Sequence, residues 1–133
     1  MCKIIYSRIL PIGKEANAMA FYPFIVVKKS RRAFFTPFVE RHERIHLAQQ
    51  AETGVAGIIL TALVALAGGG WWSLLALPLY LWLYALLFVW KFLGCRNWLQ
   101  AYQRNPLEIE AYAFQRSPGY LAERKPWAWL SLS

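Results

Sequence analysis

The chain has 133 residues, the length of a single domain, and 58% of them are hydrophobic, too large a fraction for an ordinary soluble domain. A net charge of +8 is compatible with nucleic-acid binding, but the basic residues gather before and after one long uncharged stretch. That arrangement favours contact with anionic lipid headgroups and argues against a nucleic-acid partner.

Residues 1–35 are predicted to form a small β element. Residues 21–29 are rich in β-branched and aromatic side chains, which favours a strand. Pro23 restricts this strand to a sheet edge, or falls among its first residues. Residues 4–10 are a weaker strand candidate, and the two segments are expected to pair as a hairpin or small sheet.

The next predicted element is a long helix that carries the main motif of the chain. It begins with Thr36 as N-cap and Pro37 at the first helical position. The sequence H-E-x-x-H at positions 42–46 contains both histidines of the chain. On a helix, His42 and His46 lie on one face about 5–6 Å apart, so they can bind one metal ion together.

Glu43, one residue after His42, is rotated about 100° around the helix axis and can meet a water molecule held by the metal. The simpler alternative is an ordinary hydrogen-bonded pair of surface histidines.

No charged residue occurs between positions 53 and 90. This stretch is too long for one membrane span of about 20 residues and barely long enough for two, and glycines at 68–70 supply a turn. The sequence therefore predicts a mainly α, integral membrane fold: a two-span helical hairpin. Residues 36–67 would form the motif helix and first span, and residues 71–94 the second span. Because only the flanks are basic, the positive-inside rule places them and the site on the cytoplasmic side.

Pro78 is expected to kink the second span, in which Tyr80 and Tyr84 are interpreted as packing residues. Asn105 and Pro106 then open another helix, residues 105–117. The tail, residues 118–133, is too short to span and is expected to lie at the membrane interface.

A catalytic zinc site usually has three protein ligands and one open position, so H-E-x-x-H needs a further ligand. A two-span hairpin returns the chain to the same side of the membrane just before Glu108 and Glu110. These residues are two apart on a helix, about 200° around its axis, so only one can face the metal. Asn105-x-x-Glu108 also resembles a capping box, which would engage Glu108 and leave Glu110 for the metal.

The two motifs resemble those of gluzincin metallopeptidases, especially the membrane-embedded group with the CAAX prenyl proteases and the bacterial heat-shock membrane proteases. Those proteins pair H-E-x-x-H with a downstream E-x-x-A-D, matched here by Glu108-Ile109-Glu110-Ala111-Tyr112 over about half of the chain. The resemblance implies one Zn²⁺ per chain, bound by His42, His46 and Glu108, with Glu110 as the alternative. Tyr112 replaces an aspartate that orients a ligand histidine, and its phenol could make a comparable hydrogen bond.

Peptide-bond hydrolysis is the expected reaction, with Glu43 as the general base. The strand around residues 24–27 is expected to bind extended substrate by edge pairing. A donor must also stabilise the oxyanion. The candidates are Tyr102, Tyr112, Tyr120 and Arg116.

These observations predict a zinc metalloendopeptidase in an inner membrane of bacterial type, acting on peptides or membrane proteins. One rival is a catalytically silent membrane scaffold. Another is a metal-binding membrane protein such as a di-iron carboxylate protein, because Glu43-x-x-His46 has the E-x-x-H spacing. A di-iron site uses two such motifs, and the chain has no third histidine for the second.

Overall fold

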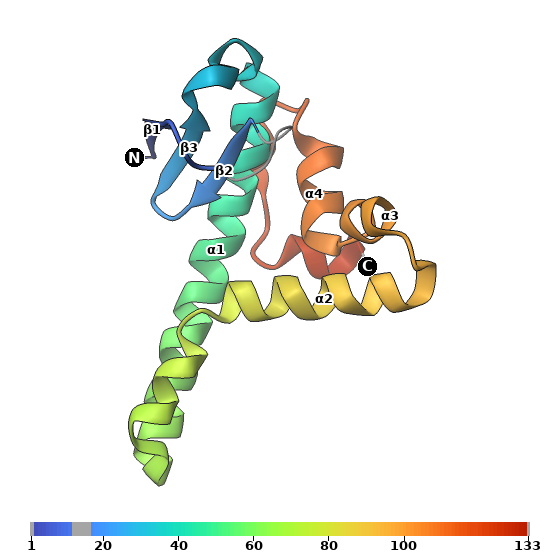
Figure 1. Cartoon of the computed structure of the whole chain (residues 1–133). Helices are drawn as coiled ribbons and strands as arrows, with labels where there is room; N and C mark the ends of the chain where they lie inside the picture. Colours follow the sequence, from blue (N-terminus) through green and yellow to red (C-terminus); the bar gives the residue numbers. More distant parts are fainter. Residues whose placement is uncertain (1, 12–16, 133) are drawn as a thin grey trace.

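The computed structural model of the chain describes residues 2–11 and 17–132 and is mainly helical with one small sheet (Figure 1). The strands are β1 (Lys3–Ser7), β2 (Ala18–Phe21) and β3 (Phe24–Lys28). β3 lies in the middle, parallel to β1 and antiparallel to β2. The predicted mainly α fold with a small N-terminal β element is therefore confirmed.

Of the two predicted alternatives, a strand at a sheet edge or a strand with Pro23 among its first residues, the structure excludes the first and is close to the second. Pro23 lies just before the first residue of β3, where it removes no hydrogen bond from the sheet, so β3 can pair on both sides. Ile25 and Val27 alternate along β3 and are fully buried. They pack on Leu47 of the long helix and form the small core between sheet and helix.

Helix α1 (Pro37–Val64) follows a short 3-10 helix, η1 (Lys29–Phe34). Its start is as predicted: the Thr36 hydroxyl accepts a hydrogen bond from the Val39 amide at 3.4 Å, and Pro37 occupies the first turn. The first half of α1 is buried against the rest of the fold, whereas its apolar second half is largely exposed. The metal-site motif lies in the buried half.

The chain reverses beyond α1 through η2 (Ala65–Gly69) and returns along it as η3 (Gly70–Ala76) (Figure 1). Gly68 and Gly70 adopt positive φ angles of 89° and 55°, which side chains disfavour. At the open end of this hairpin Gly57 touches η3 so closely that a Cβ atom there would lie 2.8 Å from the Ala76 carbonyl oxygen. We call residues 57–76 the apical hairpin.

The predicted second span is not a single helix. Residues 71–94 are divided between η3 and helix α2 (Leu79–Cys95), and α2 turns away from α1 instead of running beside it (Figure 1). Pro78 lies at the break, where its ring and missing amide hydrogen prevent an uninterrupted helix. Among the described residues one helical stretch, Pro37–Ala76, is long and apolar enough to cross a membrane on length and composition alone.

After α2 the chain forms α3 (Trp98–Gln103), α4 (Pro106–Phe114), α5 (Tyr120–Glu123) and η4 (Ala128–Leu132). Helix α4 is the predicted third-ligand helix and ends three residues earlier than expected. It packs against both α1 and η4. In the tail, Trp129 is buried in the fold and is not available to a membrane interface.

Candidate metal centre

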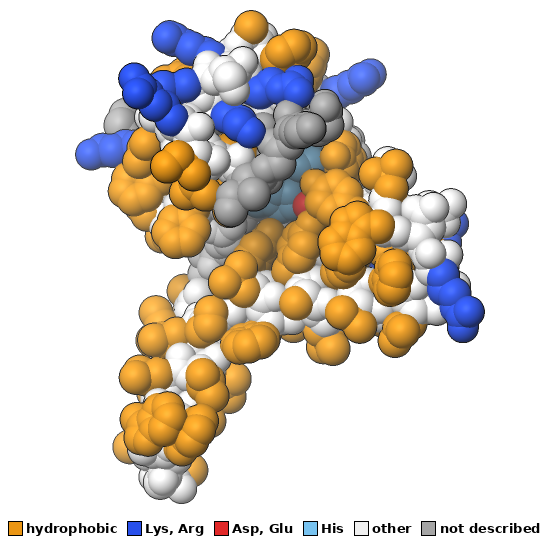
Figure 2. All heavy atoms as spheres, viewed as in Figure 1, with side chains coloured by type: hydrophobic (Ala, Val, Ile, Leu, Met, Phe, Trp, Pro, Cys, Tyr) orange, Lys and Arg blue, Asp and Glu red, His pale blue; other side chains and the backbone are white. Residues whose placement is uncertain are grey.

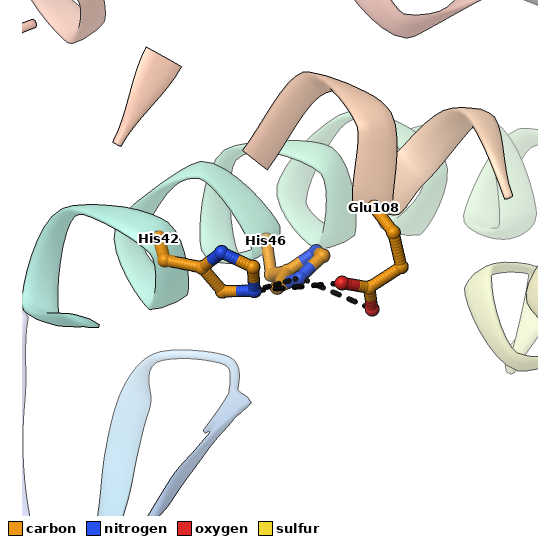
Figure 3. Close-up of side chains that lie close together, drawn as sticks. All are labelled: His42, His46 and Glu108. Carbon is orange, nitrogen blue, oxygen red and sulfur yellow. Dashed lines mark hydrogen bonds and ion pairs between the residues drawn. The ribbon is translucent and has the colours of Figure 1, made fainter. Parts of the chain in front are cut away.

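Three buried side chains converge between α1 and α4: His42, His46 and Glu108 (Figure 3). The Nε2 atoms of His42 and His46 are 3.2 Å apart. His42 Nε2 lies 3.5 Å from Glu108 Oε2, and His46 Nε2 lies 3.5 Å from Glu108 Oε1. The motif helix and the later helix therefore supply one compact group of three potential ligands.

The geometry of this group is suited to a metal ion. Ligand atoms at two corners of a tetrahedron, each about 2.0–2.1 Å from a central ion, lie roughly 3.3 Å apart. The three separations given above bracket that value. Glu108 Oε2 is also buried with no hydrogen-bond partner among the described residues, a deficit that a bound cation would remove. The group could therefore hold a metal ion.

The start of α4 explains why Glu108 faces the histidines. Asn105 caps the helix by accepting a hydrogen bond from the Leu107 amide at 3.1 Å. The backbone N–H of Asn105 donates to the Tyr102 carbonyl oxygen, also at 3.1 Å, so it is already engaged and the predicted capping box does not form. Burial raises the pKa of the Glu108 carboxyl group, but the neighbouring imidazoles of His42 and His46 outweigh burial and hold the pKa well below its usual range. Glu108 is therefore a carboxylate.

Glu110, the alternative ligand, is engaged elsewhere. Its carboxylate accepts hydrogen bonds from Gln49 at 3.0 Å and Tyr120 at 2.9 Å and pairs with Arg124. Arg124 also pairs with Glu52 of α1. Burial lowers the pKa of Arg124, but its hydrogen bonds to the two carboxylates dominate and raise it, so the guanidinium stays charged. Glu110 thus belongs to a buried ion-pair network beside the metal group.

Gln49 connects this network to the metal group, a role that sequence reasoning missed. Its Nε2 atom donates to the Leu107 carbonyl oxygen and to Glu110 Oε2, both at 3.0 Å. With both amide hydrogens used, Gln49 Oε1 must accept from His46 Nδ1, 2.9 Å away. His46 therefore carries its proton on Nδ1 and keeps the Nε2 lone pair for a metal. The available signal was spacing, because residue 49 is one turn after His46.

Two tyrosines of α2 also reach the ligands. The Tyr84 hydroxyl donates to Glu108 Oε1 at 2.9 Å, and the Tyr80 hydroxyl lies 3.3 Å from His46 Nδ1. Their interpretation as packing residues within a span was wrong. Their spacing of four residues, in a segment otherwise almost wholly apolar, was a signal for a polar face on α2.

The predicted oxyanion donors are dispersed. Tyr102 lines the cavity in front of the ligands, and burial together with the nearby Glu108 charge raises the pKa of its hydroxyl, which stays protonated. Tyr112 packs its ring edgewise against His42, with centroids 4.7 Å apart. The Tyr120 hydroxyl instead donates a hydrogen bond to Glu110, and Arg116 is exposed and does not line the cavity. Of the four predicted donors, only Tyr102 and Tyr112 therefore lie beside the metal group.

A cavity of about 730 Å³ opens between α1, β2 and α2, with the metal group and Glu43 in its wall. Figure 2 shows histidine and acidic atoms at the bottom of this opening. Most of the remaining wall is apolar or aromatic, including Phe21, Leu77 and Leu81. The site thus combines a buried polar group with an apolar approach.

The predicted substrate strand does not have a free edge. Residues 24–27 belong to β3, whose two sides are paired with β1 and β2. The strand beside the cavity is β2. Part of its outer edge is occupied by Gln50, whose side chain accepts from the Tyr22 amide at 2.8 Å and donates to the Ala20 carbonyl oxygen at 3.0 Å.

Fold and site together define a small, mainly helical protein with a buried group of two histidines and one glutamate that could bind a metal. Comparison with known proteins gives no narrower identity: no family model, curated protein or solved structure matches the chain.

Proposed function

We propose that the chain is a zinc-dependent membrane metallopeptidase that hydrolyses peptide bonds with Glu43 as the general base. The observation that carries this proposal is the ligand triangle of 3.2, 3.5 and 3.5 Å formed by the H-E-x-x-H histidines and Glu108. Two imidazoles and one carboxylate with an open fourth position form a donor set of catalytic zinc sites. The long apolar stretch supports a membrane location.

The side chains around the ligand triangle have complementary roles in this reaction. Zinc bound there would activate a water molecule and polarise the scissile carbonyl group. Glu43 is buried in the same cavity wall and would take the proton of the attacking water and deliver it to the leaving amine. Tyr102, with its protonated hydroxyl, is the favoured donor to the oxyanion.

The substrate in this proposal is an extended peptide or a segment of a membrane protein. It would enter the apolar cavity beside β2, because β3 is already paired on both sides. Pairing along the whole of β2 would require the Gln50 side chain to leave the Ala20 and Tyr22 backbone groups.

Metal content tests the site first. Full-length purified protein should contain about one zinc per chain by elemental analysis, and His46→Ala should lose it. Glu108→Ala should also lose zinc, whereas Glu110→Ala should retain the ligand triangle. Gln100→Ala, an exposed change on α3, is the control and should keep full zinc content. Protein without bound metal would end the proposal.

Catalysis is tested separately with Glu43→Gln, which keeps the shape of the side chain but removes the base. This variant should bind zinc normally and lose cleavage of a peptide library in detergent or vesicles. Cleavage that survives in Glu43→Gln would refute the assigned base. Stoichiometric zinc without cleavage by the unaltered protein would instead favour a metal-binding membrane protein that is not an enzyme.

A further inference from the structure

Helix α2 has two chemically different faces. One face meets the rest of the fold: Tyr80 and Tyr84 reach the metal group, and the Phe88 ring packs edgewise on Trp98 with centroids 4.5 Å apart. The opposite face is apolar and uncovered. Its exposed side chains are Trp82, Leu86, Val89, Trp90 and Leu93.

The apical hairpin continues this apolar surface. Leu66 near its tip is 86% exposed, and Trp71 and Trp72 stack on each other at the turn, both exposed. Figure 2 shows hydrophobic side chains along the hairpin and the underside of α2, whereas the basic side chains gather on the opposite part of the molecule and at the far end of α2. An uncovered apolar surface of this extent marks a membrane or interaction face.

The length of the apical hairpin limits how it meets a bilayer. Gly68 at the turn lies eleven positions after Gly57, where α1 meets the end of η3. At 1.5 Å per residue the hairpin extends about 16 Å, roughly half of a hydrocarbon core of about 30 Å. A hairpin of this length reaches the middle of a bilayer and returns.

The direction of α2 determines how this helix lies when the hairpin enters a bilayer. It begins at Leu79, just after the base of the hairpin, and runs across the molecule instead of along α1 (Figure 1). When the hairpin points into the membrane, α2 lies parallel to the membrane surface with its apolar face towards lipid. Lys91 and Arg96, at its carboxyl-terminal end, can then meet anionic headgroups.

We propose that the protein is monotopic: the apical hairpin enters a single leaflet, and α2 lies in the plane of the membrane with its apolar face in the lipid. The occupant of both apolar surfaces is a bilayer, because they are continuous and the sequence has no charge from residue 53 to residue 90. Tyr80, Leu81 and Tyr84 of α2 line the cavity, so in this arrangement a single helix, α2, lies between the metal group and the lipid.

Depth measurement on the full-length protein in phosphatidylcholine and phosphatidylglycerol vesicles tests this proposal. Nitroxide labels are placed singly on cysteines in a Cys2→Ser, Cys95→Ser background, and depth is taken from collision with oxygen and with a water-soluble nickel chelate. Four positions share the apolar face of α2. The variants are Trp82→Cys, Leu86→Cys, Val89→Cys and Leu93→Cys.

We expect the four α2 labels to report one shallow depth and Leu66→Cys to report the greatest depth. A spanning α2 would give a difference of about 16 Å between positions 82 and 93, which would overturn the proposal. Exposure of all four labels to the nickel chelate would overturn it too, and so would protection from both reagents, since a protein would then cover this face.

One further measurement guards against a damaged variant, and another tests whether the hairpin crosses the bilayer. Circular dichroism of each labelled protein checks the helical content, and if Trp82→Cys loses helix, positions 86 and 93 still distinguish one depth from a gradient of about 10 Å. A membrane-impermeant maleimide should fail to react with Leu66→Cys from either side of the vesicle. Reaction from the side opposite the basic flanks would show that the hairpin crosses and would contradict the monotopic arrangement.

Discussion

Gln49→Met is the most informative single change in the metal centre. Methionine matches the length of glutamine and keeps the buried position filled, but it has no N–H to donate, and its sulfur is only a weak acceptor in place of the amide oxygen. His46 would lose the acceptor that fixes its proton on Nδ1, so part of its population would carry the proton on Nε2, where the metal must bind. The ligand would still be present but in the wrong tautomer.

The expected loss follows from this contact. Removing a partner that orients a ligand histidine typically lowers metal affinity about 10–100-fold, which corresponds to about 1.4–2.7 kcal/mol. A second, separate cost falls on folding. The Leu107 carbonyl oxygen loses one of its donors, and the loss of a hydrogen bond typically costs about 0.5–1.5 kcal/mol. Glu110 Oε2 keeps its contact with Arg124, so the ion-pair network should survive.

The two effects are measured independently. Zinc affinity is obtained by competition with a chromophoric chelator on the full-length protein in detergent, at a temperature where both proteins are folded. Unfolding of the metal-free proteins is followed by circular dichroism. Gln100→Met is the matched control: it makes the same chemical change at an exposed position of α3 and should leave both quantities unchanged.

A variant that is destabilised yet binds zinc as tightly as the unaltered protein would refute the reasoning, because Gln49 would then serve packing alone. The converse, a weaker zinc affinity with unchanged unfolding, would show that the Leu107 carbonyl finds another partner. It would leave the role of Gln49 towards His46 intact.

Three further changes test other contacts. Gly57→Ala places a Cβ atom 2.8 Å from a backbone oxygen of η3 and should lower the free energy of unfolding by about 1–3 kcal/mol in thermal unfolding. Its control, Gly54→Ala, meets open space and should be neutral or stabilising by up to about 1 kcal/mol. Equal effects of the two changes would contradict the close hairpin contact. Arg124→Met leaves two carboxylates without their cation and should cost about 3–5 kcal/mol in chemical denaturation, and a loss below about 1 kcal/mol would argue against a buried pair. Tyr84→Phe removes the hydrogen bond to Glu108 and should weaken zinc binding about 10-fold in chelator competition, while unaltered affinity would exclude this support for the ligand.

Much of the metal group could be predicted from local pattern. Helical spacing put His42 and His46 together, and the angle of about 200° between Glu108 and Glu110 meant that only one could face them. The choice between the two glutamates could not be derived locally. It depends on Arg124, which pairs with Glu110 from a later part of the chain. It also depends on the Tyr102 carbonyl oxygen, which accepts a hydrogen bond from the Asn105 backbone N–H and so prevents the capping box.

The sheet was predicted only in part for a related reason. β1 and β3 have β-branched residues and were expected, whereas β2 has the sequence Ala-Met-Ala-Phe, with little strand propensity of its own. Its conformation is set by pairing with β3 and by the contacts of Gln50 with its outer edge. Strand propensity does not include such tertiary contacts. β2 was therefore not predicted, and neither was the central position of β3 between β1 and β2.

The path of α2 could not be inferred from hydropathy, because average apolarity measures how much of a helix avoids water and not the direction in which it runs. Both a spanning helix and a helix lying flat satisfy the composition of residues 71–94. The distinction rests on two polar atoms: the hydroxyls of Tyr80 and Tyr84 reach His46 and Glu108, so α2 must pass across the ends of both ligand side chains. A second span running beside α1 would carry those tyrosines away from Glu108. The same change of direction at Pro78 that supports the metal group therefore leaves the apical hairpin, in the proposed arrangement, as the segment that enters the bilayer, with α2 lying along the membrane surface.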